Sequence, residues 1–155
     1  MTLDQYLSLG ETIPLGTHTF DVGSIKEFAA KWDPQPFHLD EELARHSVFG
    51  ALCASGWHTA SVWMKLNLAQ QDKATAQAWD GPGPRPEFGP SPGFQNLRWP
   101  KPVFAGETVS YSRKVTAHRR MASRPGWRIV TTLAEAYDST GDKVLEFESA
   151  VLLRA

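Results

Sequence analysis

The second half of the chain is dominated by hydrophobic and polar residues in alternation, the pattern of half-buried strands. Four segments are expected to form strands: residues 94–99, 107–118, 127–137 and 143–153. In the third segment, one face would carry Trp127, Ile129, Thr131, Leu133 and Tyr137. Residues 121–126 and 138–142 are turn sequences that connect the last three segments. The pattern therefore predicts an antiparallel meander.

The first half of the chain has apolar residues at helical spacing instead. At positions i, i+3, i+4 and i+7 stand Ile25, Phe28, Ala29 and Trp32. This spacing predicts one apolar face of a short helix. Residues 24–27 match a capping box with Ser24 as the N-cap, and Pro34 would end the helix. Asp40 is expected to cap a second short helix over residues 41–46.

A longer helix is expected over residues 57–71, where apolar side chains leave almost no polar stripe. Such a helix is predicted to be enclosed on most sides by a sheet. Residues 17–22 predict a short strand, and residues 79–93 form a long loop because they contain nine prolines and glycines. Together these elements predict one α+β domain over residues 1–155, with an antiparallel sheet wrapped around a central apolar helix.

Composition and charge narrow the class of protein. The chain has 155 residues, of which 41% are hydrophobic and 21% charged, and a formal net charge of -1, which gives no support to a nucleic-acid surface. Residues 113–128 contain six Lys or Arg and no acid, so they form either a solvated hairpin or a patch for phosphates. The single cysteine, Cys53, suits a reducing compartment. With no signal peptide pattern and no apolar run that could span a membrane, we expect a cytoplasmic protein.

Candidate chemistry lies between the two short helices. Asp33 and His38 are five residues apart with Pro34 and Pro36 between them, so one helix cannot contain both. A turn that begins at Asp33, with proline second, would bring the two side chains together. A carboxylate and an imidazole that meet over one water molecule can act on it as acid and base.

Three segments resemble the MaoC-like dehydratases and (R)-specific enoyl-CoA hydratases. Residues 28–40 (FAAKWDPQPFHLD) resemble the hydratase motif of this family, and residues 54–57 (ASGW) fall where the family opens its central helix. Residues 98–108 (RWPKPVFAGET) resemble its entry into the long antiparallel strands. The resemblance implies a hot-dog fold and a homodimer or higher homo-oligomer, usually with two sheets joined edge to edge.

The resemblance also implies roles for three residues. Asp33 and His38 would activate one water molecule for addition to a 2-enoyl thioester, or remove water in the reverse reaction. Gly56 would bind the thioester oxygen through its backbone N–H, which suits the unpaired donors at a helix N-terminus. No metal or redox cofactor is implied, because the acyl carrier, coenzyme A or an acyl-carrier protein, enters as part of the substrate.

Three further residues are candidates for substrate binding. The family often has histidine before the glycine and a small or sulfur-bearing residue after it, whereas this chain has Ser55 and Trp57. Trp57 is expected to narrow or reshape the acyl pocket. Ser55 would lie at the start of the helix. Arg98 could orient a pantetheine or a phosphate, or could pair with a surface acid.

Two other functions remain open at this stage. Hot-dog thioesterases typically use an acidic residue in or near the central helix, but residues 50–71 contain no Asp or Glu. A non-catalytic acyl-binding subunit would not need both Asp33 and His38. A Ser-His-Asp triad has no Gly-x-Ser-x-Gly sequence to support it, and the spacing of the histidines and Cys53 does not predict a metal site.

Overall fold

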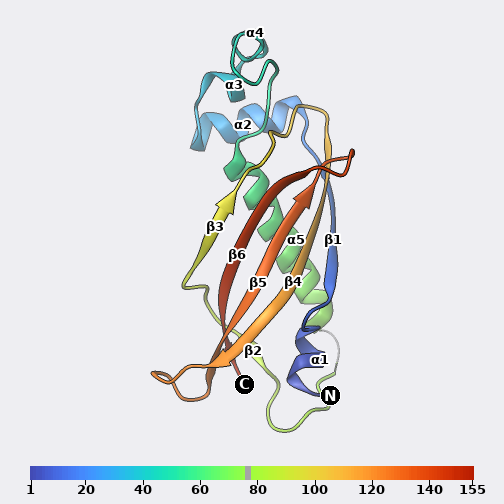
Figure 1. Cartoon of the computed structure of the whole chain (residues 1–155), viewed down its shortest axis with the longest axis vertical. Helices are drawn as coiled ribbons and strands as arrows, with labels where there is room; N and C mark the ends of the chain where they lie inside the picture. Colours follow the sequence, from blue (N-terminus) through green and yellow to red (C-terminus); the bar gives the residue numbers. More distant parts are fainter. Residues whose placement is uncertain (76–77) are drawn as a thin grey trace.

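The computed structural model describes residues 1–75 and 78–155. A curved antiparallel sheet lies against one long helix, with three short helices at one end and one at the other (Figure 1). The strands are β1 (Thr12–Thr19), β2 (Glu87–Phe88), β3 (Gly93–Arg98), β4 (Thr108–Arg120), β5 (Trp127–Tyr137) and β6 (Lys143–Arg154). The helices are α1 (Leu3–Leu7), α2 (Val22–Trp32), α3 (Pro36–Leu39), α4 (Glu41–Arg45) and α5 (Gly56–Thr75). The predicted α+β class is confirmed.

The sheet follows the predicted meander. Its strand order is β1-β4-β5-β6-β2, with β3 also paired to β6, and every pairing is antiparallel. The four predicted strands agree with β3 to β6 within two residues at each end. The tight turn after β5 is held by Asp138, whose Oδ1 accepts hydrogen bonds from the backbone N–H groups of Thr140 and Asp142, each at 3.0 Å. Lys101 Nζ donates to Oδ2 of the same buried carboxylate at 2.7 Å.

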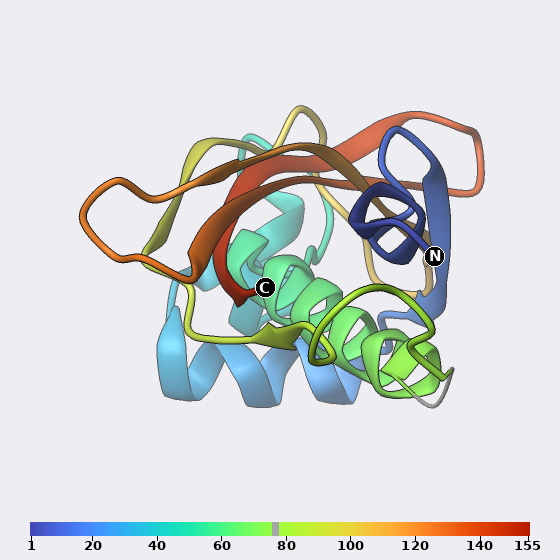
Figure 2. The ribbon, with the colours of Figure 1, turned by 90° about the horizontal axis from the view of Figure 1, so that it is seen from below.

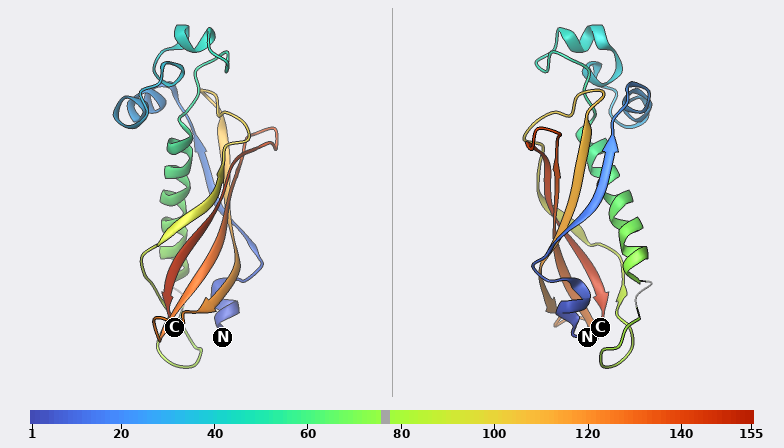
Figure 3. Two further views of the ribbon diagram at one scale, coloured as in Figure 1. Left: turned by 60° about the vertical axis from the view of Figure 1, so that its left-hand side comes forward. Right: turned by 90° about the vertical axis from the view of Figure 1, so that its right-hand side faces the viewer.

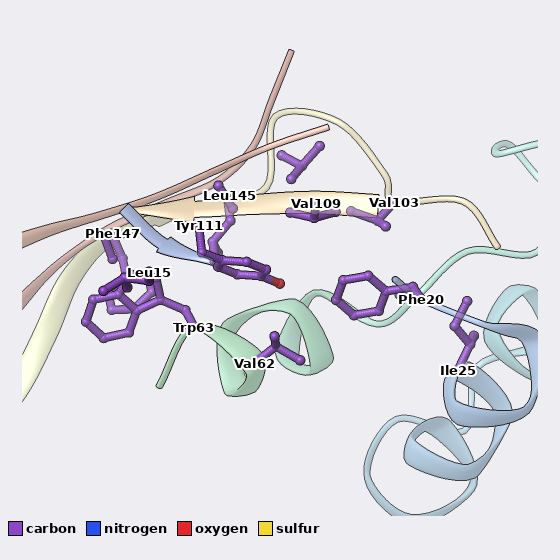
Figure 4. Packing of buried hydrophobic residues seen from close by; sticks show 14 of the residues in the cluster. Leu15, Phe20, Ile25, Val62, Trp63, Val103, Val109, Tyr111, Leu145 and Phe147 are labelled. Atoms are coloured by element: carbon purple, nitrogen blue, oxygen red, sulfur yellow. The ribbon is translucent and has the colours of Figure 1, made fainter. Parts of the chain in front are cut away.

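The core lies between α5 and the concave face of the sheet. Trp63 on α5, Val109 on β4, Leu145 on β6 and Phe20 are almost fully buried in this core (Figure 4). Two hydrogen bonds fix the helix to β4: Trp63 Nε1 donates to the carbonyl of Ser112 at 2.9 Å, and the Tyr111 hydroxyl donates to that of Thr59 at 3.0 Å. The position of α5 against the sheet is therefore set by directional contacts as well as by apolar burial.

The predicted enclosure of α5 holds for one face only. The sheet arches over one side of the helix and leaves the opposite side without a covering strand (Figures 2 and 3). Trp57, Met64 and Leu68 on that side are 49%, 41% and 50% exposed. Apolar composition alone could not reveal this, because a helix that is apolar all round is buried equally well by its own sheet or by another chain.

Two boundaries near the N-terminus differ from the prediction. The strand β1 begins at Thr12 and ends at Thr19, so it starts earlier than the expected strand over residues 17–22. The helix α2 begins at Val22 with Asp21 as its N-cap, whose Oδ1 accepts from Ser24 N–H at 3.3 Å. The prediction of Ser24 as N-cap was wrong because Asp21, which caps a helix about as well as serine, stands three residues earlier and lets the helix begin sooner.

A buried histidine in the first turn of α5 faces an aromatic cluster. His58 stacks on Phe28 with ring centroids 4.6 Å apart and makes an edge contact with Phe20 at 4.9 Å. Its Nδ1 has no hydrogen-bond partner among the residues that the structure describes. Burial, with a smaller contribution from His18, lowers the pKa of His58 to about 4, although Asp21 acts in the opposite direction. Protonation of this ring is therefore easier in the unfolded chain.

We predict that His58 makes stability fall in mild acid. Above the ordinary histidine pKa of 6.5 the ring is neutral in both the folded and the unfolded chain, and the folded state keeps its full stability. As pH falls from 6.5 toward about 4, only the unfolded chain takes up the proton, so this stability is lost. Between pH 7.5 and pH 5.0 this group alone should lower the free energy of unfolding by about 2 kcal/mol. Urea unfolding at both pH values measures the change, and His58→Leu should remove this part of it. The exposed His46, replaced by Leu, is the control; an equal pH dependence in wild type and His58→Leu would contradict the prediction.

Candidate active site

The candidate site forms where the chain reverses direction after α2. Asp33 is the C-cap of this helix, and its N–H donates to the carbonyl of Ala29 at 2.9 Å. The N–H of Gln35 then donates to the carbonyl of Asp33 at 2.8 Å, which closes the turn. Pro36 is the first residue of α3, a position that suits proline, and His38 follows within the same turn of helix. The chain reversal brings Asp33 Oδ2 to 3.4 Å from His38 Nε2.

The orientation and tautomer of His38 are fixed by the segment before α5. His38 Nδ1 lies 2.6 Å from the carbonyl oxygen of Cys53. A carbonyl can only accept, so Nδ1 carries a proton and the neutral ring has its lone pair at Nε2. This lone pair is on the atom that approaches Asp33. The imidazole is therefore ready to accept a proton at Nε2.

The carboxylate of Asp33 is held from both sides by hydrogen-bond donors. Ser55 Oγ donates to Oδ2 at 2.7 Å, and Gln35 Nε2 donates to Oδ1 at 2.7 Å. Ser55 is fully buried and its Oγ also accepts from the N–H of Trp57 at 3.2 Å. The structure thus places Ser55 behind Asp33, outside the cavity lining, where it orients the carboxylate.

A cavity of about 520 Å³ opens in front of these groups. Asp33 and His38 line one part of it, and Gly56, Trp57 and Trp99 line another. The rest of the lining is mostly apolar and comes from Phe37, Phe49, Cys53, Ala54, Pro100, Pro102, Val103 and Val144, with Gln35, Thr59 and Lys101 as its further polar members. A cavity of this kind, with few polar groups on an apolar wall, is typical of small-molecule sites.

Gly56 begins α5 beneath an indole ring. Trp99 Nε1 donates to the carbonyl of Gly56 at 3.0 Å, and a Cβ at position 56 would lie 2.3 Å from Trp99 Cε2. Only glycine permits this contact. Across residues 1–75 and 78–155, no acceptor is in hydrogen-bond range of the Gly56 N–H, which leaves this donor free for a ligand.

The sequence did not identify Trp99 as a site residue. Its indole meets Trp57 edge to face, with ring centroids 5.1 Å apart, so the two tryptophans form one wall of the cavity. The only signal was the position of Trp99 directly before Pro100, at the end of a predicted strand. Neither alternation nor composition could have related it to a glycine 43 residues away.

The basic candidates lie away from this cavity. Arg98 ends β3, is exposed, and pairs with Glu146 in the sheet register without lining the cavity. Arg119, Arg120 and Arg124 are exposed around the β4–β5 turn, at the end of the molecule opposite α2 to α4 (Figure 1). The basic run therefore does not border the cavity of its own chain.

The described residues contain no group of three or more His, Cys, Asp or Glu side chains placed to hold a metal ion. Asp33 is the only acid that lines the cavity in the part of the chain that the structure describes. The polar groups in the cavity wall thus include one carboxylate, one imidazole and the backbone of Gly56. None of the helices over the described residues is long and apolar enough to cross a membrane.

Comparison with known proteins finds a family model that matches most of the chain and solved structures that match nearly the whole of it. The model of the MaoC like domain family matches residues 9–135. The crystal structure of a MaoC-like dehydratase from Rhodospirillum rubrum is 33% identical, with a TM-score of 0.79, and the match covers 99% of this chain and 97% of that chain. An (R)-hydratase of A. caviae involved in PHA biosynthesis is 27% identical, with a TM-score of 0.67, over 92% and 94% of the two chains. The uncharacterized protein YdeM of Bacillus subtilis is 25% identical over 157 residues, which is 99% of each chain.

Proposed function

Because the chain belongs to the MaoC-like domain family and has its hot-dog fold, we propose that it is a hydro-lyase acting on acyl thioesters. It would add water to a 2-enoyl thioester or remove water from a 3-hydroxyacyl thioester. The observation that carries this proposal is the 3.4 Å approach of Asp33 to His38 on the wall of a cavity that also contains the start of α5 at Gly56.

The proposed reaction needs only these groups. A water molecule in front of Asp33 Oδ2 and His38 Nε2, hydrogen-bonded to both, would lose a proton to this pair as its oxygen bonds to C3 of the substrate. The electrons of the double bond would move toward the thioester, and the enolate oxygen would accept a hydrogen bond from Gly56 N–H. The proton held by the pair would then pass to C2. The reverse sequence removes water, and no atom or electron is left over.

The substrate would supply everything else that the chemistry requires. The acyl carrier, coenzyme A or an acyl-carrier protein, would enter with the acyl group, and we propose no metal or redox cofactor.

We also propose a homodimer, since the exposed residues Trp57, Met64 and Leu68 of α5 and Phe94 of β3 offer apolar surface to a second copy. The single buried Cys53 supports a cytoplasmic location.

One assay separates hydration from the competing functions. Purified protein is given crotonyl-CoA, and the enone absorbance and the free thiol are followed together. Loss of absorbance without thiol release is expected for a hydro-lyase. Thiol release would instead indicate a thioesterase, which the absence of any acid other than Asp33 in the cavity lining of the described chain disfavours. If neither signal changes across a series of acyl chain lengths, the chain would be an acyl-binding subunit.

We predict that Ser55 acts on turnover through Asp33. Ser55→Ala removes the 2.7 Å hydrogen bond to Oδ2, so the carboxylate loses its fixed orientation. One such bond to a charged group is worth about 1.5–3 kcal/mol, and we expect kcat to fall roughly 10-fold or more while KM changes little. Ser61→Ala is the control, because Ser61 Oγ bonds only the Trp57 carbonyl on the exposed side of α5. A change in KM alone would argue for a substrate contact instead.

A further inference from the structure

A second cavity, of about 450 Å³, lies between the sheet and the later turns of α5. Its apolar wall includes Leu7 of α1, Trp63 of α5, and Val130 and Val151 of the sheet. No residue lines both cavities. The second cavity is therefore separate, within this chain, from the one that holds Asp33 and His38.

One charged residue lies in the wall of this second cavity. Along β4, Val109, Tyr111, Arg113 and Val115 alternate on the face toward α5, and the other three are buried. Arg113 thus lies on the inward face of β4, where the alternation along the strand predicts an apolar side chain. Its Nη1 donates to Asn67 Oδ1 on α5 at 2.9 Å, which aims the guanidinium into the space beneath the helix.

Arg113 has no acid to balance its charge among residues 1–71 and 78–155, since no carboxylate of these residues lies within 4.0 Å of it. A guanidinium has five N–H donors, and the bond to Asn67 uses one. Burial also lowers the pKa of Arg113, because the charged guanidinium is partly removed from water. A partly buried cation without a counter-ion is destabilising, so its presence here favours a role in binding an anion.

We propose that the second cavity binds a ligand with an apolar body and a carboxylate end, and that Arg113 holds the carboxylate. Guanidinium and carboxylate match in a planar, two-bond arrangement that lysine cannot reproduce. The apolar body would lie against Val130, Val151 and Leu7, and Asn67 keeps the guanidinium in place. The carboxylate could belong to a free aliphatic acid or to the far end of an acyl group, since the recognising chemistry is the same.

Titration of the whole protein with octanoate, octan-1-ol and octylamine, followed by amide chemical shifts, tests this site. Octanoate is expected to bind at least tenfold more tightly than the other two and to shift signals of residues around Arg113 and Asn67. Arg113→Met should remove this preference for octanoate while leaving octanol binding unchanged. Arg119→Met, an exposed arginine of the same strand, should change nothing. Equal binding of the three compounds, or unchanged octanoate binding by Arg113→Met, would overturn the proposal.

Three further measurements remove ambiguity. Arg113→Lys keeps the charge without the planar fork, so it should fold as the wild type and still lose most of the octanoate affinity. The affinity for a thioester of hexanedioic acid is compared with the affinity for octanoate. Tighter binding of the thioester would identify the far end of an acyl group as the source of the carboxylate, and tighter binding of octanoate would identify a free acid. Asp33→Asn should bind octanoate as the wild type does, because Asp33 does not line this cavity. Loss of binding in that variant would instead place the ligand in the first cavity and overturn the assignment.

Discussion

Replacement of Asp33 by Asn, or of His38 by Ala, is expected to lower kcat for hydration of a 2-enoyl thioester by about 10²–10⁴-fold. Asparagine has the shape of aspartate and can still bond Gln35 and Ser55, but it cannot take a proton from water. Alanine at position 38 removes the Nε2 lone pair that faces Asp33 at 3.4 Å. Loss of enone absorbance with the best acyl substrate measures both effects.

Controls for these variants come from the same segment. Asp40 caps α4, where its Oδ1 accepts from Leu43 N–H at 2.9 Å, and asparagine caps helices as well as aspartate. Asp40→Asn should therefore leave both kcat and folding unchanged. His46→Ala removes an exposed imidazole and should also be silent. If Asp33→Asn or His38→Ala keeps more than half of the wild-type kcat, the proposed mechanism is wrong.

Gly56→Ala is expected to have the second largest effect, because the added methyl group has no room. An ideal Cβ would lie 2.3 Å from Trp99 Cε2, and the indole is held by its bond to the Gly56 carbonyl. Either the ring or the start of α5 must move, which takes the Gly56 N–H away from the position proposed for the substrate oxygen. Loss of one such donor raises the barrier by about 2.7–4 kcal/mol, or roughly 10²–10³-fold in kcat.

The cause of this effect can be isolated with a second substitution. Trp99→Leu in the Gly56→Ala background makes room for the methyl group and should recover part of the lost activity. Gly23→Ala is the matched control, since Gly23 is also in the first turn of a helix and its added Cβ would have only an ordinary contact at 3.7 Å. Wild-type kinetics in Gly56→Ala would show that neither the indole contact nor the amide position matters for turnover.

Elements defined by local sequence were predictable. The four strands could be located because each combines alternation with a turn sequence of its own, as with the Asp138 turn. The approach of Asp33 to His38 was predictable for the same reason, since two prolines restrict the chain between them. The predicted approach of the two side chains is present, although the chain reverses through an Asp33–Gln35 contact and a helix that begins at Pro36 rather than through the expected turn.

Features that depend on distant residues were not predictable. Trp99 covers Gly56 from another part of the chain, and Arg113 faces inward although it belongs to a run of basic residues. Periodicity places a side chain on a face but does not reveal which cavity that face borders. The exposed stripe of α5 has the same explanation, because its apolar residues look alike in sequence whether or not the sheet reaches them.

The carbonyl that orients His38 belongs to Cys53, the only cysteine of the chain. Burial, together with the negative charge of Asp33, raises the pKa of the Cys53 thiol to about 11. At neutral pH only about one thiol in ten thousand is ionised, so the folded protein should resist alkylating reagents. The same sulfur becomes reactive once the segment between α4 and α5 separates from α3. Cys53 is thus a natural chemical probe for opening of the end of the molecule that holds Asp33 and His38.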